Sequence, residues 1–250
     1  MMSSFGLTDK GRYRAENQDA FAIADTEGGL VAVVCDGMGG AAAGRLASDM
    51  AVKRFISFAK KGFAVSGSGQ EEDVLRQAAD SANRQIYHFA ATAEEYNGMG
   101  TTLVGAVFGE AQATFVNVGD SRAYRIARDG IVQITKDHSL VQRMVDAGEI
   151  TREQARRHPR RNIITRAVGS EAFVTCDLFT CPVRPGDIFL LCTDGLTNTV
   201  PDAELHRLAL AAEDPESACR ALVEAALENN TRDNVTAVIV SPAKGGGDLG

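Results

Sequence analysis

The chain has 250 residues, of which 44% are hydrophobic and 24% charged, so it can bury a core as one large domain or two small ones. Its net charge of −7 does not suit a protein that coats nucleic acid or an anionic membrane. No apolar run approaches the roughly 20 residues that span a bilayer, and residues 1–5 lack the basic and apolar regions of a signal peptide, so we expect a cytoplasmic protein.

Segments typical of β-strands recur along the chain, and pairs of segments typical of helices separate them. The predicted strands are 20–24, 30–35, 102–108, 113–118, 122–127, 131–135, 188–192 and 235–240. The predicted helices are 44–60, 71–92, 138–147, 202–212 and 215–229. Gly109-Glu110 and Asp129-Gly130 mark hairpins, and the second favours a type I′ turn. Consecutive hairpins and paired helices indicate an α+β fold, in which helices cover antiparallel sheets.

Cysteine and histidine do not form a metal-binding pattern. The five cysteines include no CxxC pair, and Cys35 and Cys192 lie inside apolar runs, where we expect buried thiols. The four histidines are scattered. Any metal ligands are therefore expected to be carboxylates, which select hard cations such as Mg²⁺, Ca²⁺ or Mn²⁺.

Positive charge is concentrated in the segment 151–166, which has six arginines and one glutamate in an otherwise acidic chain. Two interpretations are open. The segment is either a solvated helix and loop or a surface that meets an anionic substrate.

Five short motifs place acidic and glycine residues at the ends of predicted strands. In chain order they are 14–19 (RAENQD), 36–40 (DGMGG), 119–122 (GDSR), 193–196 (TDGL) and 232–234 (RDN). Each alone has a simpler explanation, because Asp-Gly is a common turn and an arginine is an ordinary surface residue.

Together the motifs put Asp36, Asp120, Asp194 and Asp233 at strand ends, which packed sheets can bring to one edge. Carboxylates gathered at a partly buried site repel each other, and divalent cations remove that cost. The glycines after Asp36 let the backbone approach an ion closely, and the Gly37 carbonyl is a further candidate ligand.

With these five motifs, in this order and over about residues 4–240, the sequence resembles the metal-dependent protein phosphatases of the PPM family (type 2C) in their compact bacterial form. The resemblance implies a four-layer α-β-β-α sandwich, with two central antiparallel sheets and helix pairs outside. It implies one domain over 1–242 with a flap at about 135–166, and the Gly-rich composition of 243–250 predicts a flexible tail. The implied function is metal-dependent hydrolysis of phosphoserine and phosphothreonine in proteins by a metal-bridging water, opposing a bacterial Ser/Thr kinase.

The resemblance also implies roles for particular residues. Two Mn²⁺ or Mg²⁺ ions would be held by Asp36, the Gly37 carbonyl, Asp194 and Asp233, and a third, weaker ion by Asp120 with Asp194. Arg14 would bind the phosphate, and Arg14, Asp36 and Asp194 would be the catalytic residues. Asp19 would orient metal-bound water, and Gln18 and Asn234 would hold the metal ligands in position without binding metal themselves.

The sequence departs from some relatives at two positions. Met38 stands where they have a histidine proposed as the general acid, and Gln18 stands where they have a glutamate. Because methionine cannot donate a proton, we expect a metal-bound water or another group to protonate the leaving group. His138 is a candidate for that role, but a structural role at a helix start is favoured.

Two other functional classes stay open beside an active protein phosphatase. A catalytically silent phosphoprotein-binding module would be favoured by loss of a metal aspartate or of Arg14, and none is lost. A phosphatase of small molecules would be recognised by its preference for nucleotide or sugar phosphates. Nucleic-acid binding is disfavoured because no aromatic residues alternate with the arginines. We expect a monomer whose partners are phosphorylated proteins and a kinase.

Overall fold

The computed structural model describes residues 2–66 and 69–242, and its framework is two antiparallel sheets packed face to face. The predicted tail at 243–250 lies outside the described residues. No helix of the described part of the chain is both long and apolar enough to cross a membrane.

Each sheet is built from strands far apart in the sequence. The first has the order β1 (Met2–Asp9), β11 (Val235–Pro242), β10 (Ile188–Cys192), β7 (Arg122–Ala127) and β8 (Gly130–Gln133). The second has the order β2 (Asp19–Thr26), β3 (Gly29–Met38), β5 (Leu103–Phe108), β6 (Gln112–Val118) and β9 (Asp177–Pro182), and the short β4 (Gly100–Thr101) pairs with β3. The apolar sequences of β3 and β10 fit strands with both faces covered.

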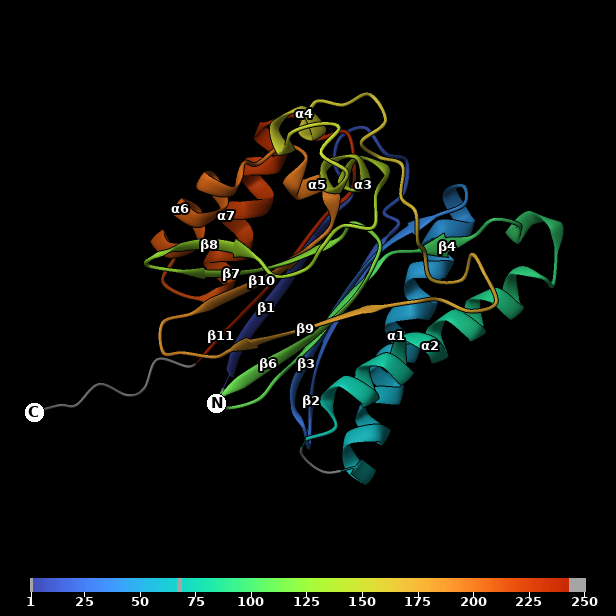
Figure 1. The fold of residues 1–250 in the computed structure, drawn as a ribbon, viewed down its shortest axis with the longest axis horizontal. Helices are drawn as coiled ribbons and strands as arrows, with labels where there is room; N and C mark the ends of the chain where they lie inside the picture. The colour runs from blue at the N-terminus through green and yellow to red at the C-terminus, as the bar shows by residue number, and fades with distance from the viewer. Residues whose placement is uncertain (1, 67–68, 243–250) are drawn as a thin grey trace, which may run out of the picture.

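Helix pairs cover the outer faces of the two sheets (Figure 1). The helices α1 (Ala41–Ser66) and α2 (Glu71–Ala90) lie on the second sheet, and α6 (Asp202–Ala211) and α7 (Pro215–Glu228) lie on the first. A third apolar cluster, which includes Phe108, Phe115 and Phe189, fills the space between the sheets. The four-layer α+β sandwich predicted from the sequence is confirmed.

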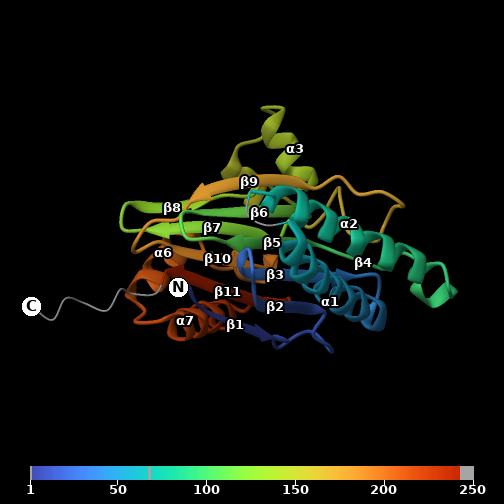
Figure 2. The same ribbon diagram turned by 90° about the horizontal axis from the view of Figure 1, so that it is seen from below.

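A smaller helical segment stands apart from these layers, and Figure 2 shows α3 projecting away from the sheets. It contains α3 (Leu140–Asp146) and α4 (Arg152–Arg156), within the range 135–166 expected to form the flap. The Ser139 hydroxyl caps α3 by accepting from Gln142 N, and Thr151 caps α4 with a reciprocal bond to Gln154. A bridge between Ser139 and Ile164 joins the two ends of the segment.

Three details differ from the sequence-based expectations. The edge strands β1 and β9 were not predicted, and neither were the short helices η1 (Glu94–Tyr96), α4 and α5 (Asp194–Thr197). The hairpin between β7 and β8 forms, but Gly130 pairs with Ala127, so Arg128 and Asp129 make the turn. Among the described residues only Asn230 is a non-glycine residue with positive φ, so the predicted type I′ turn was wrong.

Candidate metal centre

The four aspartates predicted at strand ends lie together at one end of the sandwich. Asp36 is near the end of β3, Asp120 is in the turn from β6 to β7, Asp194 begins α5 directly after β10, and Asp233 precedes β11. All four line one open pocket of about 520 Å³. Its wall also contains four other residues singled out individually from the sequence: Arg14, Gln18, Gly37 and Met38.

Burial and mutual repulsion raise the pKa values of these carboxyl groups. Burial is the main cause for Asp36, whose pKa lies well above its usual value, and the charges of Asp19 and Asp194 add to it. Burial and the charge of Asp233 raise the pKa of Asp194 to about 6. The pKa of Asp120 is also well above its usual value, again mainly through burial. The fully ionised cluster is therefore unfavourable without a nearby positive charge.

Asp19 lies behind the pocket, not in its wall. It pairs with Asp36 across β2 and β3, and its side chain is 8% exposed. The hydroxyl groups of Thr193 and Thr236 donate to its Oδ2 at 2.8 and 2.7 Å. Burial raises the pKa of Asp19 to about 7 despite these hydrogen bonds. The residue thus adds a further carboxyl group directly beneath Asp36.

Arg14 reaches the pocket from an irregular segment between β1 and β2. Its Nη2 donates to Asp233 Oδ2 at 2.7 Å, and its Nε donates to Arg232 O at 3.3 Å. The Arg14 side chain is 47% exposed, so part of the guanidinium remains accessible from the pocket. The predicted phosphate-binding residue and a predicted metal ligand are therefore direct neighbours.

Asn234 fixes the segment that carries Arg14. Its Nδ2 donates to the carbonyls of Lys10 and Glu16 at 2.8 and 3.0 Å, and its Oδ1 accepts from Gln18 N at 2.9 Å. The side chain is 3% exposed. The start of β11 is thereby tied to both ends of the segment that contains Arg14.

Glycines allow three parts of the backbone to meet around the aspartates. A Cβ on Gly37 would collide with Gly44 O in the first turns of α1, and a Cβ on Gly195 would collide with Asn234 O. Gly37 N also donates to Gln18 O at 3.0 Å. The Asp-Gly pairs are thus required by close packing at the pocket and not by turns of positive φ.

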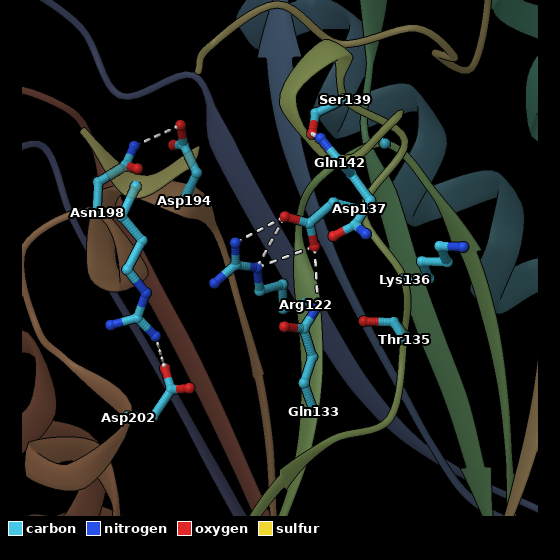
Figure 3. A network of polar contacts seen from close by, with 12 residues as sticks. Arg122, Gln133, Thr135, Lys136, Asp137, Ser139, Gln142, Asp194, Asn198 and Asp202 are labelled. Atoms are coloured by element: carbon cyan, nitrogen blue, oxygen red, sulfur yellow. Dashed lines mark hydrogen bonds and ion pairs between the residues drawn. The ribbon is translucent and has the colours of Figure 1, made fainter. Parts of the chain in front are cut away.

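A half-buried arginine, Arg122, is close enough to Asp120 and Asp194 for its charge to act on both carboxyl groups. Arg122 binds Asp137 through Nε and Nη2, the latter at 2.6 Å, and its Nη1 donates to Tyr124 Oη at 3.0 Å. Figure 3 shows this pair and, beside it, Asn198 donating to Asp194 at 2.9 Å. Burial dominates the pKa values of Asp120 and Asp194, and the charge of Arg122 opposes that rise.

His138 holds the turn that presents Asp120. Gly119 N donates to His138 Nδ1 at 3.2 Å, and His138 N donates to Gly119 O at 2.8 Å. The imidazole is 6% exposed and is not part of the pocket wall, while its Nε2 lies 3.2 Å from Asp177 Oδ2. The structural role favoured from the sequence agrees with this placement.

The oxygen-rich donor set fits a hard divalent cation. Asp194 Oδ1 and Asp19 Oδ1 are buried and have no hydrogen-bond partner among the described residues. Within residues 2–66 and 69–242, however, no three acidic, histidine or cysteine side chains already surround a common point as ligands of one ion do. Asp194 Oδ2 accepts from Asn198 and Asp233 Oδ2 accepts from Arg14, so Asp194 Oδ1, which has no partner in the described part of the chain, is the oxygen open to an ion without loss of a hydrogen bond.

Some residues at the site were not predicted from the sequence. Thr102 Oγ1 accepts from Asp36 N at 2.9 Å and shares a hydrogen bond with Ser121. Asn162 and Ile164 enter the pocket wall from the end of the flap segment. Their residue types carry no signal in one sequence, because threonine, asparagine and isoleucine are common in ordinary strands and loops.

Comparisons with known proteins agree with this site. A family model described as protein phosphatase 2C matches residues 12–229. The serine/threonine phosphatase stp of Listeria innocua serovar 6a is 38% identical over 234 residues, which cover 93% of each chain. The structure of the serine/threonine phosphatase Stp1 from Staphylococcus aureus is 39% identical, with a TM-score of 0.90 over 97% of this chain and 95% of that one.

A third comparison includes metal ions. The catalytic domain of the serine/threonine protein phosphatase PstP, solved in complex with two manganese ions, is 31% identical. Its TM-score is 0.84, over 96% of this chain and 97% of that one. From the family match, the identity over nearly the whole chain and the shared fold, we conclude that this chain belongs to the protein phosphatase 2C family.

Proposed function

We propose that this protein is a phosphatase that uses divalent metal ions to hydrolyse phosphoserine and phosphothreonine in other proteins. The observation that carries this proposal is the pocket in which Asp36, Asp120, Asp194 and Asp233 meet beside Arg14. The relatives named as serine/threonine phosphatases support the substrate class.

In this proposal, Asp36, the Gly37 carbonyl, Asp194 and Asp233 would hold two Mn²⁺ or Mg²⁺ ions, and Asp120 with Asp194 a third. Bound ions of this kind lower the pKa of a water toward neutrality and offset the charge of a phosphoryl group. Gln18 and Asn234 would keep the ligands in place through their backbone contacts. Asp19, held by two threonine hydroxyls, would accept a hydrogen bond from water in the site.

Arg14 would bind the phosphate, since its planar guanidinium can offer two parallel donors to phosphoryl oxygens. Metal binding by Asp233 would release that guanidinium from its present ion pair. Met38 lies in the pocket wall but has no proton to give, so protonation of the leaving alcohol must come from water or another group.

The wider biological setting is also a proposal. We infer that the protein acts as a monomer in the bacterial cytoplasm on proteins phosphorylated by a Ser/Thr kinase, whose signal it reverses. Bacterial relatives named as serine/threonine phosphatases support this setting.

The direct test is phosphate release from a phosphothreonine peptide with EDTA, Mg²⁺ or Mn²⁺. Activity should require metal, and Asp194→Ala should lower it about 100-fold or more, the scale of losing a group that stabilises transition-state charge. Asp129→Ala is the matched control, because that aspartate is 76% exposed in the β7–β8 turn and does not line the pocket. EDTA-resistant activity, or full activity in Asp194→Ala, would refute the proposal.

A second set of substrates distinguishes a protein phosphatase from a phosphatase of small molecules. Under the proposal, kcat/KM for the phosphopeptide exceeds that for nucleotide and sugar phosphates. The reverse order would assign the same metal chemistry to a different substrate class.

A further inference from the structure

A second pocket adjoins the metal centre. It has a volume of about 440 Å³, and its wall mixes apolar residues such as Phe173 with hydroxyl-bearing ones such as Ser170. Its wall comes mainly from residues 164–175, and it shares Met38 and Ile164 with the wall of the metal pocket. We call it the flank groove. The two pockets meet at Met38 and Ile164, so a chain bound in the metal pocket can continue into this groove.

The most exposed aromatic side chain of the described residues stands in the wall of the flank groove. Phe173 is 86% exposed. Two other large exposed hydrophobic residues adjoin the metal pocket in sequence: Tyr13 precedes Arg14, and Ile163 lies between two residues of the pocket wall. Of these three residues, Phe173 lines a pocket itself, so a group bound in the flank groove would contact its apolar ring.

The loop that carries Phe173 is held rigidly. Asn83 on α2 is 1% exposed, and its Oδ1 accepts from Gly169 N at 2.7 Å. Its Nδ2 donates to the carbonyls of Glu171 and Ala172 at 3.0 and 3.2 Å. Val174 then packs on the apolar core below. In Figure 1 this part of the chain passes beside β4 before it enters β9. Because Phe173 lies between fixed points, little ordering entropy opposes binding to it.

The charges of the groove argue against an anionic occupant. Its two charged wall residues are Arg166 and Glu171. Arg166 Nη1 already donates to Asp177 Oδ1 at 2.7 Å, so its charge is largely offset. Glu171 is exposed and would repel a second phosphate or an acidic side chain.

We propose that the flank groove binds an apolar side chain of the phosphorylated substrate, at a position flanking the phosphoresidue, and that Phe173 determines this preference. The inference rests on the proposed protein phosphatase activity and adds a substrate preference to it. A peptide chain leaving the metal pocket along this path places one side chain against Phe173 and keeps acidic side chains away from Glu171.

The test compares phosphothreonine peptides that are identical except for Leu, Ser or Asp at one position, scanned on both sides of the phosphoresidue. At one of these positions the wild-type enzyme should prefer Leu over Ser by about 10-fold in kcat/KM, the scale of a few methylene contacts, and Asp should be poorest. Phe173→Ser should bring the Leu/Ser ratio close to one, and Phe173→Leu should restore most of it.

Tyr87→Ser is the matched control, because Tyr87 is an exposed aromatic residue on α2 that lines neither pocket. Its Leu/Ser ratio should equal that of the wild type. Equal hydrolysis of the three peptides at every position, or an unchanged ratio in Phe173→Ser, would overturn the assignment of the groove. A wild-type enzyme that hydrolyses an aryl phosphate but no phosphopeptide would instead overturn the proposed function, and the groove assignment with it.

Discussion

Gly37 shows how closely single residues determine the metal centre. It follows Asp36 in β3, and its Cα faces Gly44 O of α1 with no room for a Cβ. On the other side, its amide is bonded to Gln18 O. The carbonyl proposed as a metal ligand is therefore fixed by its place in β3 and by contacts with α1 and with Gln18, the residue before β2. A side chain at this position must move at least one of the three.

We expect Gly37→Ala to lower the free energy of unfolding by roughly 1–3 kcal/mol, the usual cost of overpacking, and to weaken Mn²⁺ binding. Thermal unfolding with and without Mn²⁺ measures both effects. Gly109→Ala in the β5–β6 turn is the control for a milder conflict, since its Cβ would approach Gln112 O at 3.2 Å, and we expect a smaller loss of stability with unchanged Mn²⁺ binding. If Gly37→Ala kept both the wild-type melting temperature and the wild-type Mn²⁺ shift, the close packing would not matter to the site.

At the scale of whole elements, the bounds of a strand could be predicted from the sequence where both faces of the strand are covered. β10 was predicted with its observed bounds, and β3 and β6 within a few residues, because their apolar runs are unbroken. The edge strands β1 and β9 were missed, since their exposed positions interrupt the apolar pattern.

The same limit applies to the site. The aspartates could be predicted because acidic residues at strand ends are chemically conspicuous. Thr102 and Asn162 could not, since they reach the pocket only through tertiary packing. The short helix α5 was also missed, because Asp194-Gly195 has the sequence of a turn.

The flap segment supports a prediction about charge. Three of its arginines have ion-pair partners: Arg156 with Asp202, Arg157 with Glu153, and Arg166 with Asp177. Within the described part of the chain, no ion pair involves Arg160 or Arg161, and both are exposed. Their charges are thus available to an acidic phosphoprotein near Asn162 of the pocket wall.

Charge reversal of Arg160 and Arg161 to glutamate should raise KM for an acidic phosphoprotein about 10-fold at low salt, with a smaller effect at high salt. KM for a small aryl phosphate should not change. The control is Lys60→Glu with Lys61→Glu, an equal change of charge about 24 Å along α1 from Gly44 at 1.5 Å per residue. Similar effects on both substrates, or on both double variants, would argue against steering by the flap.

For the molecule as a whole, the carboxyl groups proposed to bind metal lower the stability of the metal-free fold. Burial raises the pKa of Asp194 to about 6 and that of Asp19 to about 7, from an ordinary value of 3.8. A raised pKa means that ionisation is less favourable in the folded than in the unfolded chain. In metal-free protein this destabilisation begins as pH rises above about 4, and it is complete above about 7. A divalent ion in the pocket should cancel it.

Asp36→Asn should therefore stabilise the metal-free protein while abolishing its activity. The pKa of Asp36 lies well above its usual value because the carboxyl is buried and because four neighbouring aspartates repel its charge. At pH 8 and in EDTA, we expect the variant to exceed the wild type in free energy of unfolding by roughly 1–3 kcal/mol, since one pKa unit corresponds to about 1.4 kcal/mol. The difference should shrink as pH falls from 8 toward 4 and should vanish well below 4, where the wild-type carboxyl is protonated in both the folded and the unfolded state. Mn²⁺ should reverse the order at pH 8, because it stabilises only a protein that binds it.

Urea unfolding at pH 8 and pH 4 measures these changes, with the exposed Asp129→Asn as control. An Asp36→Asn variant that is less stable than the wild type in EDTA at pH 8 would contradict this prediction. Hydrogen bonds lost with the carboxylate would then outweigh the repulsion, and the carboxyl cluster would not destabilise the metal-free fold.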